Sequence, residues 1–254
     1  MSPREPVHRT AAVARHNLVL VAREPGPAIS RIVMPVVIVL VLRPLYTSAL
    51  GGPVRGTTQV VVGMLVMFSL LGVSVVGNSV LTERSWHTLD RLRATPARPI
   101  ELLVGKALPA LLLVLLQQAV VLGLGIGALG LRVASAGLLA AAMLAWAFAL
   151  LGIGAAVAVM VRSPAELSAA TDIGSMIFTC FGGALIPLAA MPGWAHAVAP
   201  FSPAYWGMRG LSAALAGDGR GTLTAVAILA AVAVLAAAVA GRRLARGWGR
   251  GHLI

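Results

Sequence analysis

The residue types that carry catalysis or bind metals are few in this sequence and are not grouped. The single Gly-Lys pair, Gly105-Lys106, has Ile100 where a phosphate-binding loop needs its first glycine, so we expect no ATP to bind by that route. Cys180 is the only cysteine, and the five histidines are scattered and lie outside the predicted spans. This pattern predicts no disulfide, no metal site and no membrane serine protease. We therefore predict no catalytic residue and no cofactor on this chain.

One acidic side chain, Asp172, falls inside an apolar stretch. A charge at membrane depth costs about 2.5–3.5 kcal/mol on insertion scales, so it must face protein or water. Two roles are open: attracting a cation at an inner vestibule, or pairing with Arg162, Arg31 or Asn78. The amides of Gln117 and Asn78 are expected to hydrogen-bond between helices.

A basic loop over residues 82–100 contains a short helical pattern. Trp86, Leu89 and Leu92 share one side of it, and Pro96 ends it. Such a stripe favours docking on a partner, whereas sealing against lipid headgroups is the alternative.

The elements that position these residues are membrane spans. The 254 residues are 59% hydrophobic and 11% charged, with a mean hydropathy of +0.92, which excludes a water-soluble globule. The net charge of +12 does not indicate nucleic acid, because the basic residues lie between apolar runs without interleaved aromatics. Anionic lipid and membrane topology explain them better.

The apolar windows predict an all-α polytopic protein, a single transmembrane domain over residues 1–254. Residues 1–28 predict an amphipathic helix lying in the headgroup layer, with a solvated helix as the alternative. Gly130-Leu131-Arg132 marks a tight turn between the third and fourth spans. The six predicted spans are residues 29–50, 60–81, 107–131, 133–161, 167–190 and 222–240.

The distribution of basic residues predicts the orientation. Fifteen of the twenty Lys and Arg residues fall in segments predicted to be inside and five in those outside. The positive-inside rule therefore predicts that both termini are cytoplasmic.

Prolines and aromatics gather after the fifth predicted span, in residues 191–210. Pro192 and Pro203 interrupt any continuous helix, and Trp194, Tyr205 and Trp206 favour a membrane interface. This pattern indicates short broken helices at the outer boundary. An ordinary aromatic belt is the alternative.

Two segments are similar to a known family. Residues 83–96 resemble the E-x-x-x-G-T-L-E-x-L-x-x-T-P signature of ABC-2 type permeases, the membrane subunits of type V ABC exporters, with His87 in place of the usual Gly. Residues 181–206 resemble the family's G-x-x-x-P, P-x-W and P-x-x-Y segment. The Ala, Arg and Gly bias suggests a GC-rich gene, and the resemblance is to drug-resistance exporter permeases of actinobacteria.

The resemblance implies a coupling helix, an outer gate and partners. The implied coupling residues are Glu83, Trp86, Thr88, Leu89, Asp90, Leu92, Arg93, Thr95 and Pro96. The implied re-entrant outer gate comprises Gly183, Pro187, Pro192, Trp194, Pro203, Tyr205 and Trp206.

The partners implied are a separate ABC ATPase carrying ATP and Mg, and a second copy or related permease. The location implied is the bacterial cytoplasmic membrane. Because the apolar spans cannot fix a polar substrate, we expect export of an amphipathic drug, antibiotic or lipid-like molecule. Alternatives are a proton-driven secondary transporter, a glycan exporter and a non-transporting scaffold.

Overall fold

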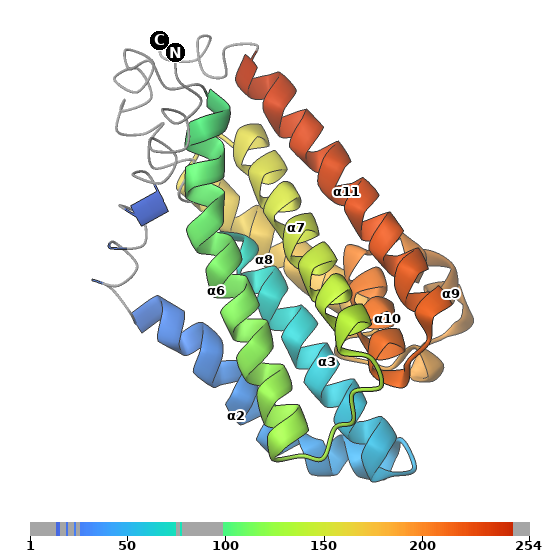
Figure 1. Cartoon of the computed structure of the whole chain (residues 1–254). Coiled ribbons are helices and arrows are strands. Elements are labelled where there is room, and N and C mark those ends of the chain that lie inside the picture. The colour runs from blue at the N-terminus through green and yellow to red at the C-terminus, as the bar shows by residue number, and fades with distance from the viewer. Residues whose placement is uncertain are drawn as a thin grey trace.

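The computed structural model describes residues 14–15, 19, 23, 26–74, 77 and 99–245, and only the backbone of 27–28, 99–106 and 244–245. Every regular element within these residues is a helix (Figure 1). The predicted interfacial helix over 1–28 lies largely outside the described residues. Asn78 and residues 82–98 of the predicted coupling loop lie wholly outside them.

Seven longer helices and three short ones follow one another along the described chain. They are α2 (Gly26–Ala49), α3 (Pro53–Leu71), α6 (Pro99–Gly127), α7 (Ala136–Met160), α8 (Pro164–Phe181), η1 (Leu188–Ala190), α9 (Gly193–Val198), η2 (Ala199–Phe201), α10 (Pro203–Ala216) and α11 (Gly219–Ala245). Of these, α2, α3, α6, α7 and α11 are long and apolar enough to cross a membrane. Helix α8, with Glu166 and Asp172, is not among them. The predicted fifth span over residues 167–190, and with it the count of six spans, therefore stays a prediction.

The helix bounds show what the hydropathy windows missed. Helix α3 begins before the predicted start at 60, because Pro53 occupies its first turn, where proline is favoured. Helix α8 ends before the predicted limit at 190, because two glycines follow Phe181. The turn between α6 and α7 is where the sequence indicates it, and Gly130 has a φ of 73° there.

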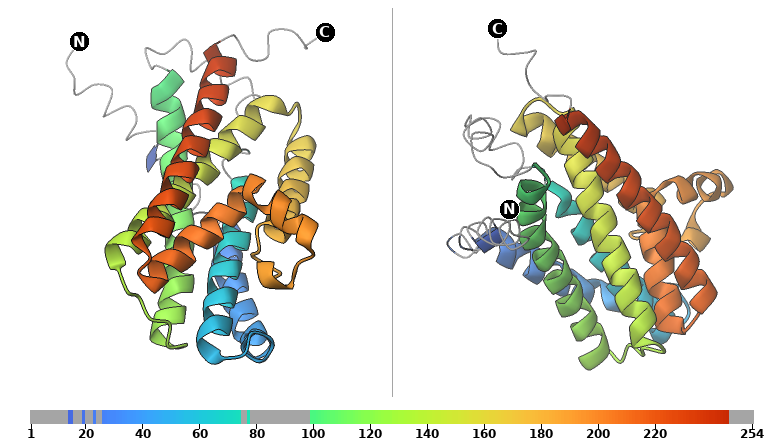
Figure 2. Two further views of the ribbon diagram at one scale, coloured as in Figure 1. Left: turned by 90° about the vertical axis from the view of Figure 1, so that its right-hand side faces the viewer. Right: turned by 45° about the horizontal axis from the view of Figure 1, so that its top comes forward.

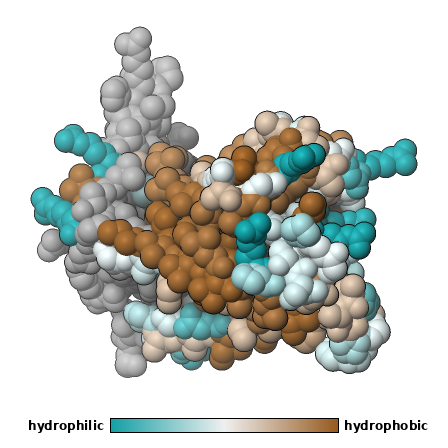
Figure 3. All heavy atoms as spheres, turned by 90° about the horizontal axis from the view of Figure 1, so that it is seen from below, coloured by the Kyte–Doolittle hydropathy of each residue, from teal (hydrophilic) through white to brown (hydrophobic). Residues whose placement is uncertain are grey.

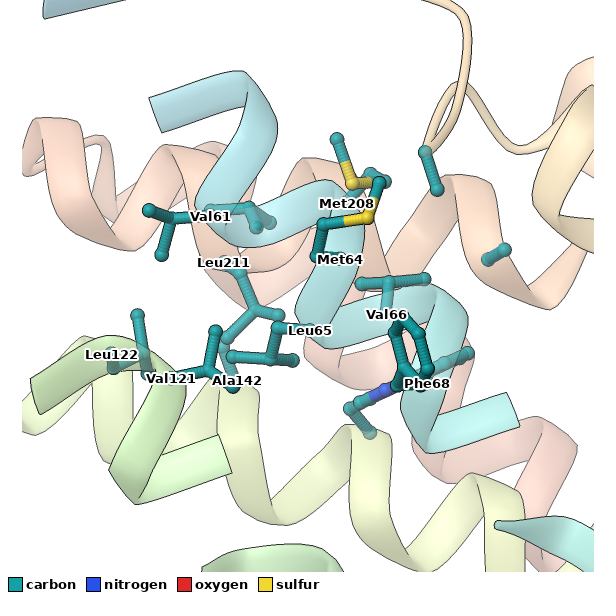
Figure 4. Close-up of a cluster of buried hydrophobic side chains, with 14 of the residues drawn as sticks. Val61, Met64, Leu65, Val66, Phe68, Val121, Leu122, Ala142, Met208 and Leu211 are labelled. Atoms are coloured by element: carbon teal, nitrogen blue, oxygen red, sulfur yellow. The ribbon is translucent and has the colours of Figure 1, made fainter. Parts of the chain in front are cut away.

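Helix α3 is the centre of the bundle. Its spanning window is 61% buried, whereas the windows of α2 and α11 are each 17% buried. Side chains from α3, α6, α7 and α10 form the hydrophobic core (Figure 4). Those labelled there are Val61, Met64, Leu65, Val66, Phe68, Val121, Leu122, Ala142, Met208 and Leu211. Helices α2 and α11 thus leave most of their surface uncovered by the rest of the described chain.

The bundle has two distinct ends. The connections at residues 50–52, 128–135 and 217–218 share the lower end in Figure 1, here called the loop end. The backbone N–H of Ala134 donates to the Leu215 carbonyl at 3.1 Å and joins the connection after α6 to the last turn of α10. Helices α7 and α11 finish at the opposite end, where α6 and α8 begin (Figures 1 and 2). Seen from the loop end, the surface has an apolar patch at its centre with more polar residues around it (Figure 3).

Two arginines in α2 make hydrogen bonds toward α3. Arg31 Nη2 donates to Ser74 Oγ at 3.3 Å, and Arg43 Nε donates to Thr57 Oγ1 at 3.2 Å. Hydroxyl acceptors on the neighbouring segment therefore help to compensate the burial of both guanidinium groups.

Candidate functional site

The chain reverses direction directly after α8, and glycine is required there. A Cβ on Gly182 would lie 2.8 Å from the backbone nitrogen of Tyr205, so a side chain would push α8 away from α10. Gly183 has a φ of 80°, in the left-handed region that side chains disfavour. Pro187 follows a few residues later and precedes the short 3-10 helix η1, so α8 does not resume after the glycines. Residues 182–187 are called the break below.

The break lies beside the middle of α3 and not at the end of the bundle. Gln59 Nε2 donates to the Gly183 carbonyl at 2.8 Å. The Cα of Gly63 faces the Ala184 carbonyl so closely that an added Cβ would overlap the oxygen. At 1.5 Å per residue, Gln59 and Gly63 lie about 9 and 15 Å along α3 from Pro53. The break is thus inserted into the helical bundle.

Three polar side chains, called the clasp below, bind backbone carbonyls at the break and at the end of α8; the Phe178 carbonyl also accepts from the Gly182 backbone. Gln59 binds Gly183, the Tyr46 hydroxyl donates to the Leu185 carbonyl, and Ser202 Oγ donates to the Phe178 carbonyl at 2.9 Å. Irregular backbone at membrane depth is tolerated only where protein or water satisfies it. The clasp meets this requirement from α2, from α3 and from the residue before α10.

The predicted gate aromatics lie around the break. Trp194 in α9 packs edge-on against Phe181, with ring centroids 5.8 Å apart. Trp206 Nε1 donates to the Pro200 carbonyl at 2.8 Å, and the Arg209 guanidinium lies 5.7 Å from the Trp206 ring centroid. Pro192 and Pro203 begin α9 and α10. The structure therefore places the predicted gate residues close together. Helix α10, however, is more buried than we expected of a helix at the membrane interface.

The sequence reasoning missed the three clasp residues. Tyr46 and Gln59 lie within apolar helices, each beside a pair of hydroxyl residues, and such polar side chains tend to hydrogen-bond between helices, which was the available signal. Gln117 and Gln118, which carry the same signal, are both buried. Within the described residues, neither side-chain nitrogen has a hydrogen-bond partner.

Asp172 lies on the exposed side of α8. Among the described residues it makes no hydrogen bond or ion pair, so it does not pair with Arg31 or Arg162, the cations proposed for it. Arg31 binds Ser74, and the Arg162 backbone nitrogen donates to Glu166 at 2.7 Å. The carboxylate is therefore available to something outside the described part of this chain.

The described residues hold no group of three or more His, Cys, Asp or Glu side chains able to bind a metal ion. What the site offers is a polar-clasped break beside α3 and an exposed carboxylate on α8.

Fold and site together define a multi-pass helical membrane protein with an irregular segment inserted beside its central helix. Residues 8–216 match the ABC-2 type transporter family, and the chain belongs to this family. Two relatives, from Escherichia coli (strain K12) and Escherichia coli O157:H7, are each described as "Probable multidrug ABC transporter permease YbhR". Each is 29% identical over 137 residues, which is 53% of this chain and 37% of the relative. The chain thus covers little more than a third of these relatives.

Proposed function

We propose that this chain is the permease subunit of an ATP-driven exporter for amphipathic, drug-like or lipid-like molecules. The observation that carries the proposal is the family match over residues 8–216, supported by two relatives described as multidrug permeases. ATP and Mg are held by a separate ATPase. The permease works as a pair, either two copies of this chain or this chain with a related one, in the bacterial cytoplasmic membrane.

The ATPase docks on the loop that joins α3 to α6, through the predicted coupling helix. The support is partly geometric, because α6 and α8 begin at the end of the bundle where α7 and α11 finish (Figure 1). The apolar stripe of Trp86, Leu89 and Leu92 supplies the anchors in an otherwise basic loop. Both termini are then on this cytoplasmic side, as the distribution of Lys and Arg favours.

The break and its clasp form the outer gate. A segment held by a few polar contacts can be released at small cost, in contrast to a continuous helix packed along its length. Trp194 and Phe201 are 62% and 86% exposed, so this segment already presents aromatic surface. ATP binding, transmitted by the coupling helix, shifts the population between clasped and released states.

The coupling role is tested by the double substitution Leu89→Asp and Leu92→Asp. We expect loss of ATPase co-purification and of ATP-dependent transport in vesicles, with the melting temperature unchanged. Val54→Asp is the matched control, because Val54 is 78% exposed at the loop end, and it should retain both activities. Retention of both by the double variant would contradict the coupling role. Export that needs no ATPase and stops with a protonophore would instead favour a secondary transporter.

A further inference from the structure

Helix α8 is arranged unlike the spans around it. Its buried residues form one line with a spacing of four, and three of the four are hydroxyl side chains: Leu167, Thr171, Ser175 and Thr179. The rest of its surface is largely exposed, including Ile173, Met176 and Ile177 at 62%, 53% and 48%. The helix thus turns small polar groups inward and apolar groups outward, with the Asp172 carboxylate beside the apolar groups of its second half.

If α8 forms the predicted fifth span, that carboxylate lies well below the membrane surface. Asp172 is about 12 Å from the first residue of α8 at 1.5 Å per residue, and an aspartate side chain is short. The other carboxylates of described side chains have partners: Glu166 accepts from the Arg162 backbone, and Asp218 accepts from the Gly221 backbone. Among the described side chains, Asp172 is therefore the unpaired carboxylate.

Neither lipid nor a water-free subunit interface is a favourable environment for the exposed face of α8. Hydrocarbon disfavours an ionised carboxylate. In the paired permease of the proposed function, on which this inference rests, a closed contact between the two α8 faces would bring two Asp172 carboxylates together, and like charges that lose water repel. The face is better suited to a hydrated cavity between the two subunits.

We propose that the exposed face of α8 binds amphipathic organic cations and so makes the exporter selective for them. The cationic centre pairs with Asp172, and the apolar body of the ligand lies on Ile173, Met176 and Ile177. Met176 suits ligands of differing shape, because its unbranched thioether adapts to irregular surfaces. A neutral ligand gains the apolar contact alone, and an anion is repelled.

The test uses two ions of nearly the same shape and opposite charge, tetraphenylphosphonium and tetraphenylborate. The affinity of each ion for the purified permease–ATPase complex is measured in detergent. For each ion, the affinity of a variant is divided by that of the wild type, so the different partition of the two ions into detergent cancels. We expect Asp172→Asn to weaken phosphonium binding by about tenfold or more and not to weaken borate binding. Glu166→Gln, which removes a carboxylate near the start of the same helix, is the matched control and should leave both unchanged.

A second variant guards against a folding defect in Asp172→Asn. Met176→Lys changes an exposed residue one turn away and places an ammonium beside the carboxylate, so phosphonium binding should fall and borate binding should rise. No phosphonium binding by the wild type, or an equal effect of either variant on both ions, would overturn the proposal. ATP-dependent transport by the same preparations distinguishes the proposed exporter function from the proposed cation selectivity. If a neutral amphiphile is transported but phosphonium does not bind, the exporter function is supported and only the cation selectivity is refuted.

Discussion

Substituting Gly63 by alanine tests whether the break is inserted beside the middle of α3. An added Cβ would overlap the Ala184 carbonyl oxygen and lie 3.2 Å from its carbon. The break and α3 must then separate by about 1 Å to reach ordinary contact distances. This movement lengthens the 2.8 Å bond from Gln59 to Gly183 beyond the range of a hydrogen bond.

The expected cost follows from these contacts. Crowding in a packed interior costs about 1–3 kcal/mol, and loss of one hydrogen bond about 1 kcal/mol. Replacing a glycine inside a helix by alanine stabilises the folded state by about 0.5–1 kcal/mol, which offsets part of this loss. We therefore expect Gly63→Ala to be about 2 kcal/mol less stable, which corresponds to a melting temperature about 4–8 °C lower for a domain of this size.

The assay is thermal unfolding of the purified protein in detergent, followed by circular dichroism. Gly123→Ala in α6 is the control, because a Cβ there meets nothing within 4 Å, and it should melt at or slightly above the wild-type temperature. If Gly63→Ala melted with the wild type, the break would not lie against α3 as described. Equal destabilisation of both variants would show a general intolerance of alanine.

Three further changes test other parts of the same geometry. Tyr46→Phe removes the hydroxyl that binds the Leu185 carbonyl and should cost about 1–3 kcal/mol in unfolding experiments, because that acceptor is left unpaired. Asp218→Ala removes the side chain that accepts from the Gly221 backbone at the start of α11, and a loss of about 1 kcal/mol is expected in the same assay. Gly217→Ala puts a side chain at a φ of 78°, and the melting temperature should fall, whereas Gly217→Asn, which tolerates this conformation, should recover part of the loss.

The sequence predicts the bundle well where the signal is local. Gly130 marks the turn between α6 and α7, and the predicted last span lies within α11. Each of these features depends on neighbours a few residues away, so a reading of short windows can find it.

The clasp and α10 depend on contacts that short windows do not contain. Gln59 is one amide in an apolar helix, and its acceptor on Gly183 is remote in the sequence. Helix α10 carries Tyr205 and Trp206, which favour an interface, yet Met208 and Leu211 on the same helix lie in the core. Its burial is decided by α3, α7 and α11 around it and not by its own hydropathy.

The distance along the chain between Gln59 and Gly183 also has a consequence for biosynthesis. These residues are 124 positions apart, and a ribosome adds about 5–20 residues per second. Helix α3 therefore exists for about 6–25 seconds before its acceptor has been made. During that interval the Gln59 amide must hydrogen-bond to water, lipid headgroups or a membrane chaperone, and α3 can pack against the break only after Gly183 has been synthesised.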